Sequence, residues 1–117
     1  MQRYGIGDQE LRLAKMLWAR EGVRSGEVVT LCKEKLNWAK STTYTMLRRL
    51  CEHGLFKNEN CRVYAVLSEE EYLGRTASEL INDKFDGSLI SFIKNYTSHN
   101  KLSAKDKKTL TNLLSGK

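Results

Sequence analysis

The hydrophobic pattern of this chain changes its period twice, and these changes limit what the chain can fold into. Up to Gly54 the apolar residues recur at helical spacing in three short stretches. Between Leu55 and Leu67 the pattern is a run of strand-forming residues around a polar turn, and after Ser68 it is helical again. We therefore expect a mostly α-helical protein with one small β-hairpin.

The three N-terminal helices are expected over residues 8–20, 25–36 and 40–53. Asp8 and Ser25 are the N-cap candidates of the first two, because short oxygen-bearing side chains can accept hydrogen bonds from the free N–H groups of a helix start. Gly54 suits the left-handed position that ends the third helix. Three short helices with turns of this kind predict a helix-turn-helix.

The hairpin is expected from Leu55–Lys57, a turn at Asn58-Glu59-Asn60, and a second strand within Arg62–Leu67. A lone hairpin is only marginally stable in water, so it must pack against the helices. A short strand near Gly22–Arg24 would extend it. Helices followed by a small sheet are the order of a winged helix-turn-helix, and residues 1–67 are its expected extent.

Residues 68–117 are expected to form a helical dimerisation domain. Ser68 begins a long helix, Gly87 interrupts the pattern, and a capping box at Ser103–Asp106 opens the last helix. These helices are too short to enclose a core, and a large exposed apolar surface marks an interface that a homodimer covers. The alternative is that they fold back on the N-terminal domain. The expected interface residues are Tyr72, Leu73, Leu80, Ile81, Leu89, Phe92, Ile93, Leu110 and Leu113.

The charge of the chain points to an anionic partner. The net charge is +6, and up to Leu67 there are 12 Lys and Arg residues against 7 Asp and Glu, a net +5. From Ser68 onward the counts are 8 and 7, a net +1. A local basic excess is typical of proteins that bind nucleic acid, although many basic surfaces serve only solubility.

The third helix carries polar and basic side chains on the face opposite its apolar stripe. Short hydroxyl side chains near a helix start can reach base edges in the major groove, and cations a turn later can reach phosphates. The simpler alternative is that the hydroxyls cap the helix and the arginines complement its dipole. The order of the elements and the basic charge, together with this face of the helix, favour DNA binding. We expect DNA contacts from Lys40, Ser41, Thr42, Tyr44, Thr45, Arg48 and Arg49, and from Lys57 and Arg62 of the hairpin.

Five segments that together span nearly the whole chain form a further pattern: Leu11–Trp18, Ser41–Leu50, Gly54-Leu55, Glu71-Tyr72 and Phe85–Tyr96. These segments resemble the penicillinase repressor family, which includes the methicillin-resistance and copper-responsive repressors. The resemblance implies an N-terminal winged helix, a C-terminal helical dimerisation domain, and repression of transcription by blocking a promoter. A two-fold homodimer is expected to bind a pseudo-palindromic operator. A cytoplasmic location is expected because no apolar run approaches the length of a membrane span and the first residues show no secretory signal. The recognition helix is the most specific part of the match.

The resemblance also implies a route of induction. In the antibiotic-resistance branch, a membrane sensor protease, or a protease that it activates, responds to β-lactam and cuts the dimerisation domain between Asn and an aromatic residue; Asn95-Tyr96 stands at the matching place. The chain departs from the family where Lys40 replaces a usual Pro, and its hairpin is short. No cysteine follows Cys61, so the cysteine cluster of the copper-responsive branch is absent from this sequence.

Other classes of function are weaker interpretations. The sequence has no phosphate-binding Gly-rich loop and no metalloprotease or nucleophile motif, so we expect no enzyme, no small-molecule substrate and no cofactor. No metal site is expected, because the cysteines lack ligand spacing; they are interpreted as structural thiols, with redox sensing as the alternative. A winged helix can also be a protein-interaction module without sequence-specific DNA binding, but that predicts an acidic or apolar third helix. RNA binding would favour more exposed aromatic rings.

Overall fold

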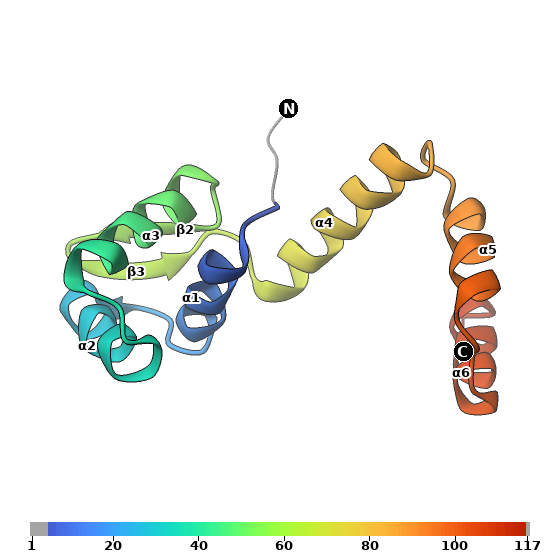
Figure 1. Cartoon of the computed structure of the whole chain (residues 1–117), viewed down its shortest axis with the longest axis horizontal. Coiled ribbons are helices and arrows are strands. Elements are labelled where there is room, and N and C mark those ends of the chain that lie inside the picture. Colours follow the sequence, from blue (N-terminus) through green and yellow to red (C-terminus); the bar gives the residue numbers. More distant parts are fainter. Residues whose placement is uncertain (1–4, 117) are drawn as a thin grey trace. The chain divides into compact units, whose positions relative to one another are not determined.

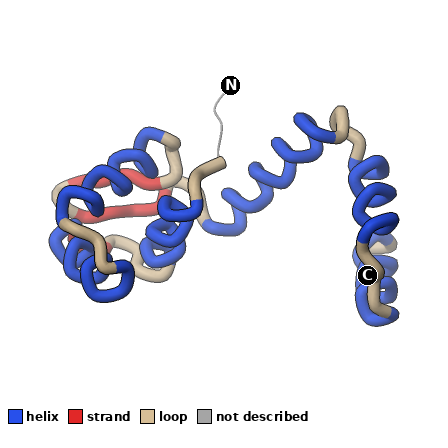
Figure 2. Tube along the Cα trace, in the orientation of Figure 1, coloured by secondary structure: helices blue, strands red, loops and turns tan. Residues whose placement is uncertain are grey.

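The computed structural model describes residues 5–116 and divides the chain into two compact units, residues 1–79 and residues 80–117. The described residues form six α-helices and one three-stranded antiparallel sheet (Figures 1 and 2). The elements are α1 Asp8–Trp18, β1 Val23–Arg24, α2 Ser25–Leu36, α3 Lys40–Glu52, β2 Phe56–Glu59, β3 Arg62–Ala65, α4 Glu69–Lys84, α5 Leu89–His99 and α6 Ala104–Leu114. The expected fold class is confirmed, and the arrangement is consistent with a winged helix-turn-helix followed by helices.

The first two helix starts differ from the expectation. Asp8 is not the N-cap of α1, because Gly7 takes that place without a side-chain hydrogen bond, and Asp8 lies in the first turn. Ser25 does not cap α2 either, since it is the first helical residue. Its hydroxyl instead donates to the carbonyl of Cys61 at 3.3 Å. Ser25, which was expected to cap α2, therefore joins this helix to the hairpin turn.

The core of the first unit is closed by α1, α2, α3 and the sheet. Leu13 and Leu50 are fully buried, and each such side chain contributes roughly 1.5–3 kcal/mol relative to exposure. Trp18 seals one end of this core: its ring lies 5.4 Å from that of Phe56 and 5.5 Å from that of Tyr72, centroid to centroid. Its indole N–H donates to the carbonyl of Leu67 at 2.9 Å. The start of α4 is thereby tied to the first unit.

The sheet has the order β1-β3-β2, with Val23 opposite Val63 and Lys57 opposite Tyr64. The short strand expected near residues 22–24 is therefore present. The turn expected at residues 58–60 was wrong, because the connection is the two-residue turn Asn60-Cys61. Both residues have positive φ, 52° and 63°. A two-residue turn with this backbone conformation matches the right-handed twist of the strands, so it is favoured over the expected three-residue loop.

The second unit contains α5 and α6, neither of which has a buried residue. Phe85 packs edge-on against Phe92 with ring centroids 5.4 Å apart. The two helices begin at Ser88 and Ser103, whose hydroxyls accept hydrogen bonds from backbone N–H groups in the first turn, as expected for the last helix. An apolar hollow of about 340 Å³ is lined by Leu89, Phe92, Ile93, Tyr96, Thr97, Leu102, Leu110 and Leu114.

Among the described residues, none of the helices combines the length and the apolar character that crossing a lipid bilayer requires.

Candidate nucleic-acid interface

The third helix is held in place by its inner face. Leu47 and Leu50 are buried in the core, and so is Thr43, whose hydroxyl donates to the carbonyl of Ala39 at 3.2 Å. This internal hydrogen bond satisfies the one buried hydroxyl of the helix, so the inner face carries no unpaired polar group. Met46 and Cys51 are half-buried against the same core, and the remaining side chains of α3 are exposed or half-buried on its other side.

The expected DNA-contacting residues of α3 lie together on its outer side. Lys40, Ser41, Tyr44, Arg48 and Arg49 are exposed, and Thr42 and Thr45 are half-buried. We call these seven residues the outer face of α3. Ser41, Thr45 and Arg48 follow one another at steps of four and three, so they form one line along the helix. Within the described residues, Arg48 has no ion-pair partner. This line presents hydroxyls at the helix start and an exposed cation further along.

Arg49 differs from its neighbour, because an acidic side chain of α1 holds it. Its Nη1 lies 3.7 Å from Oε1 of Glu10, whose side chain is only 13 % exposed. The other carboxylate oxygen of Glu10 lies 3.9 Å from Nε2 of His53. The sequence did not predict this role of Glu10, because 39 positions separate Glu10 from Arg49. Its position in the sequence indicates only an acidic residue in the first turn of a helix.

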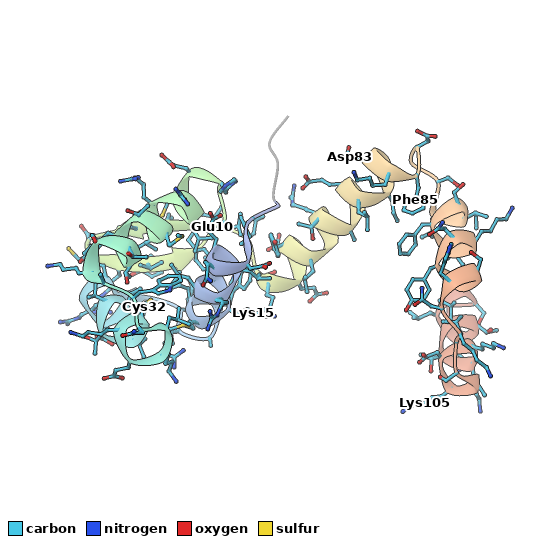
Figure 3. The ribbon with its side chains drawn as sticks, in the orientation of Figure 1. Glu10, Lys15, Cys32, Asp83, Phe85 and Lys105 are labelled. Atoms are coloured by element: carbon cyan, nitrogen blue, oxygen red, sulfur yellow. The ribbon has the colours of Figure 1, made fainter. Side chains whose placement is uncertain are left out.

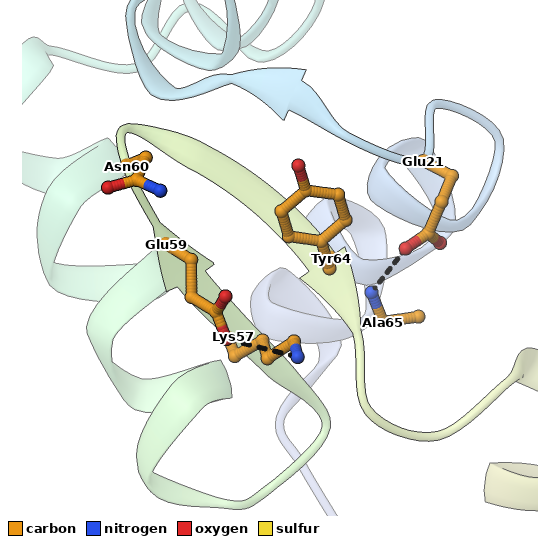
Figure 4. Close-up of a pocket in the computed structure, with 6 residues that line it drawn as sticks. All are labelled: Glu21, Lys57, Glu59, Asn60, Tyr64 and Ala65. Atoms are coloured by element: carbon orange, nitrogen blue, oxygen red, sulfur yellow. Dashed lines mark hydrogen bonds and ion pairs between the residues drawn. The ribbon is translucent and has the colours of Figure 1, made fainter.

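The hairpin is less basic than the sequence suggested. The ammonium of Lys57 pairs with the carboxylate of Glu59 at 3.0 Å and lies 6.0 Å from the ring centre of Tyr64. Arg62 donates to the carbonyl of Gly22 at 3.0 Å. Figure 4 shows a second acid on this side, Glu21, which accepts a hydrogen bond from the Ala65 N–H at 2.9 Å. Both expected hairpin cations are thus engaged within the protein, and the carboxylates of Glu21 and Glu59 line the same hollow as Lys57.

A hollow of about 480 Å³ lies where α2 meets α3. Lys33 and Lys40 line it, together with Val29, Asn37, Trp38 and Ala39. The N-cap of α3 is Ala39, which has no side chain able to accept a hydrogen bond from the helix start. The positive end of the helix dipole is therefore left open next to two cations, which makes this corner favourable for a negative group.

The sequence profile of the penicillinase repressor family matches residues 6–116. The chain belongs to the penicillinase repressor family. The penicillinase repressor of Bacillus licheniformis is 26% identical over 113 residues, which cover 93% of this chain and 88% of that protein. Membership in this repressor family supports a role in transcriptional regulation rather than in catalysis, and the resemblance inferred from the motifs is confirmed.

The residues expected at the dimer interface of this family member fall into two groups. Tyr72 is 6 % exposed and packs in the core of the first unit, and burial raises the pKa of its hydroxyl. Because it already contacts its own core, we leave Tyr72 out of the interface proposed below. The other residues are exposed or half-buried: Leu73, Leu80, Ile81, Leu89, Phe92, Ile93, Leu110 and Leu113.

The peptide bond between Asn95 and Tyr96 lies inside α5. The carbonyl of Asn95 accepts a hydrogen bond from the Ser98 hydroxyl at 2.8 Å, and a ring nitrogen of His99 lies 2.9 Å from it. Proteases that bind substrates as extended strands cannot reach a bond in this conformation. A cut at this bond therefore requires the helix to unwind locally first.

The three cysteines of this repressor-family chain have different surroundings. Cys32 is buried and Cys51 is half-buried, and burial raises the pKa of both thiols. Cys61 is exposed in the hairpin turn. Within residues 5–116, no group of three or more His, Cys, Asp or Glu side chains is placed to hold a metal ion.

Proposed function

We propose that this chain is a transcriptional repressor that binds a pseudo-palindromic operator in double-stranded DNA as a homodimer, in the cytoplasm. One observation carries the proposal: α3 presents hydroxyls and an exposed arginine on a continuous outer face while its apolar side is locked in the core. The major groove admits a helix of this width. Family membership supports the regulatory role.

The parts of the outer face have different tasks in this proposal. Ser41, Thr42 and Thr45, near the helix start, contact base edges, because hydroxyls can donate or accept and a Thr methyl can touch that of thymine. Lys40 and Arg48 contact phosphates. Glu52 lies at the far end of α3 and repels the DNA backbone. The helix therefore enters the groove by its N-terminal half.

The homodimer in this proposal forms through the second unit. Leu113 and Leu114 are 70% and 72% exposed, although they are apolar. A second copy that packs on the hollow of α5 and α6 removes this surface from water, and a two-fold axis makes both copies equivalent. Two outer faces then meet half-sites about 10 base pairs apart, or a multiple of that spacing.

Inactivation is proposed to follow the proteolytic route of the β-lactam branch, in response to β-lactam or another signal. A membrane sensor protease, or a protease that it activates, would cut between Asn95 and Tyr96. The hollow has wall residues on both sides of this bond, with Phe92 before it and Leu110 after it. The cut would therefore divide the surface that joins the two copies.

A selection from a pool of random 40-base-pair duplexes tests the DNA-binding proposal. We expect the selected duplexes to share a two-fold symmetric motif. Arg48→Ala should weaken binding to the selected duplex about tenfold and lower the slope of log affinity against log salt by about 0.9 for each lost phosphate contact. Lys105→Ala in α6 changes the charge equally and should leave both quantities unchanged. If no motif is selected and no duplex shows salt-sensitive binding, the proposal is overturned.

A further inference from the structure

We propose that Glu10 is a specificity-determining positioning residue: it holds Arg49 against α1, so that two adjacent arginines of α3 act differently on DNA. This inference rests on the proposed function. It concerns a residue outside the outer face of α3, on a different helix. In Figure 3, Glu10 lies on the part of α1 that faces α3.

The geometry joins one carboxylate to two groups on α3. Oε1 of Glu10 lies 3.7 Å from Arg49, and Oε2 lies 3.9 Å from His53, which is one helical turn further along. The Glu10 side chain is 13 % exposed, whereas that of Arg49 is 51 % exposed. The carboxylate is therefore shielded from water by its surroundings, while about half of the guanidinium still reaches solvent.

A held arginine reads DNA differently from a free one. The guanidinium has five N–H donors in a rigid fork, so an ion pair on one side leaves donors available on the other. Holding the side chain reduces the rotamer entropy that is lost when a base edge is bound. Holding it also prevents the guanidinium from turning to any nearby phosphate, whose position is the same for every sequence.

The charge of Glu10 acts in the same direction. Its negative charge offsets the attraction of Arg49 for phosphate, which is the part of binding that carries no sequence information. Among the described residues, no such acid pairs with Arg48, which keeps its full attraction. Arg48 therefore supplies affinity for any duplex, and Arg49, because of Glu10, supplies the preference for one sequence.

The test measures the ratio of affinities for the selected duplex and for a scrambled duplex of the same composition. Glu10→Gln keeps the size of the side chain and removes its charge. We expect tighter binding to the scrambled duplex, a steeper salt slope by about 0.9 per subunit as Arg49 gains a phosphate, and a ratio lowered about tenfold. Glu10→Asp retains the charge at a longer distance and should give an intermediate ratio.

Two controls separate positioning from general stability. Glu69→Gln removes an acid from another ion pair of the first unit, that with Lys15 at 3.4 Å, and should leave the ratio unchanged. In an Arg49→Ala background, Glu10→Gln should no longer alter the ratio, because the residue through which it acts is gone. A merely structural role would lower the melting temperature and change binding to both duplexes by the same factor.

The outcomes distinguish this inference from the function on which it rests. If the wild-type chain shows no salt-sensitive binding to any duplex, both are overturned. If the wild-type chain prefers the selected duplex and Glu10→Gln keeps that preference within twofold, the role of Glu10 is overturned and DNA binding stands. The role of Glu10 is likewise overturned if the effect of Glu10→Gln persists without Arg49.

Discussion

The two units of this chain use their leucines in opposite ways. In the first unit Leu13, Leu50 and Leu55 are completely buried, whereas in the second unit Leu113 and Leu114 lie mostly in water. The difference reflects geometry. Three helices and a sheet can enclose a core from all sides, whereas two helices bury only the face that they share. The first unit is closed by its own chain, and the second has an apolar face that its own helices do not cover.

The two units also differ in charge, and the difference depends on where α4 is divided. Residues 1–79 have 13 basic and 11 acidic side chains, a net +2, and residues 80–117 have 7 and 3, a net +4. The basic excess expected in the N-terminal part rests on a division after Leu67, which assigns the acidic start of α4 to the other part. The proposed binding of α3 to DNA therefore rests on the local charge of its outer face, not on the net charge of a whole unit.

The largest expected effect tests the open surface of the second unit. Phe92→Asp places two charges in the proposed interface, one from each copy. One uncompensated buried charge costs about 3 kcal/mol, so the dimer should be destabilised by about 6 kcal/mol. Sedimentation equilibrium should show only monomers at micromolar concentration. Lys94→Asp, at an exposed position of the same helix, should remain dimeric. An unchanged dimer for Phe92→Asp would contradict this placement of the interface.

The closed core of the first unit is tested by a matched pair of leucine truncations. Leu50→Ala should lower the free energy of unfolding by about 2–5 kcal/mol, because it leaves a cavity in a filled core. This loss should not depend on protein concentration. Leu113→Ala removes an equal volume from an exposed position, so its effect should appear only as weaker dimerisation. Urea unfolding at several protein concentrations distinguishes the two variants. If both lost the same stability at every concentration, the proposed difference between a closed core and an open face would be contradicted.

The smallest expected effect tests the cap at the start of α4, the helix that both units share. Ser68 and Glu71 bond reciprocally: the Glu71 N–H donates to the Ser68 hydroxyl at 3.1 Å, and the Ser68 N–H donates to the Glu71 carboxylate at 3.0 Å. Ser68→Ala should cost about 1 kcal/mol at pH 7. Ser78→Ala, at an exposed site in the middle of the helix, should change stability by less than about 0.5 kcal/mol.

The same cap predicts a dependence on pH. The backbone N–H of Ser68, and after it the Ser68 hydroxyl, donate to the Glu71 carboxylate and hold its pKa below its ordinary value of 4.5. A carboxyl whose pKa is lower in the folded state adds stability above its unfolded pKa and loses it as pH falls through the folded value. The difference in unfolding free energy between wild type and Glu71→Ala, which removes the carboxylate, should therefore narrow below pH 4.5, in urea titrations at pH 7 and pH 3. A constant difference would show that the carboxylate takes no part in the cap.

Much of the fold follows from local pattern, because periodicity and capping act over a few residues. The extent of α3, the short strand at Val23–Arg24 and the starts of α4 and α6 were predicted. Two of the errors lie where a distant partner competes with a local preference. The hydroxyl of Ser25 bonds to the hairpin turn instead of capping α2, and pairing with β3 draws Asn58 and Glu59 into a strand.

The candidate site divides along the same line. The sequence by itself determined which residues of α3 face outward, since a helix that buries Thr43, Leu47 and Leu50 has no other way to turn. Only the tertiary structure decided what surrounds each outward cation: Arg49 pairs with a carboxylate of α1, Lys57 pairs with one on its own strand, and Arg48 is exposed with no ion-pair partner among the described residues. The reason is that side-chain periodicity is a property of one helix, whereas the electrostatic surroundings of a charge depend on every element that packs beside it.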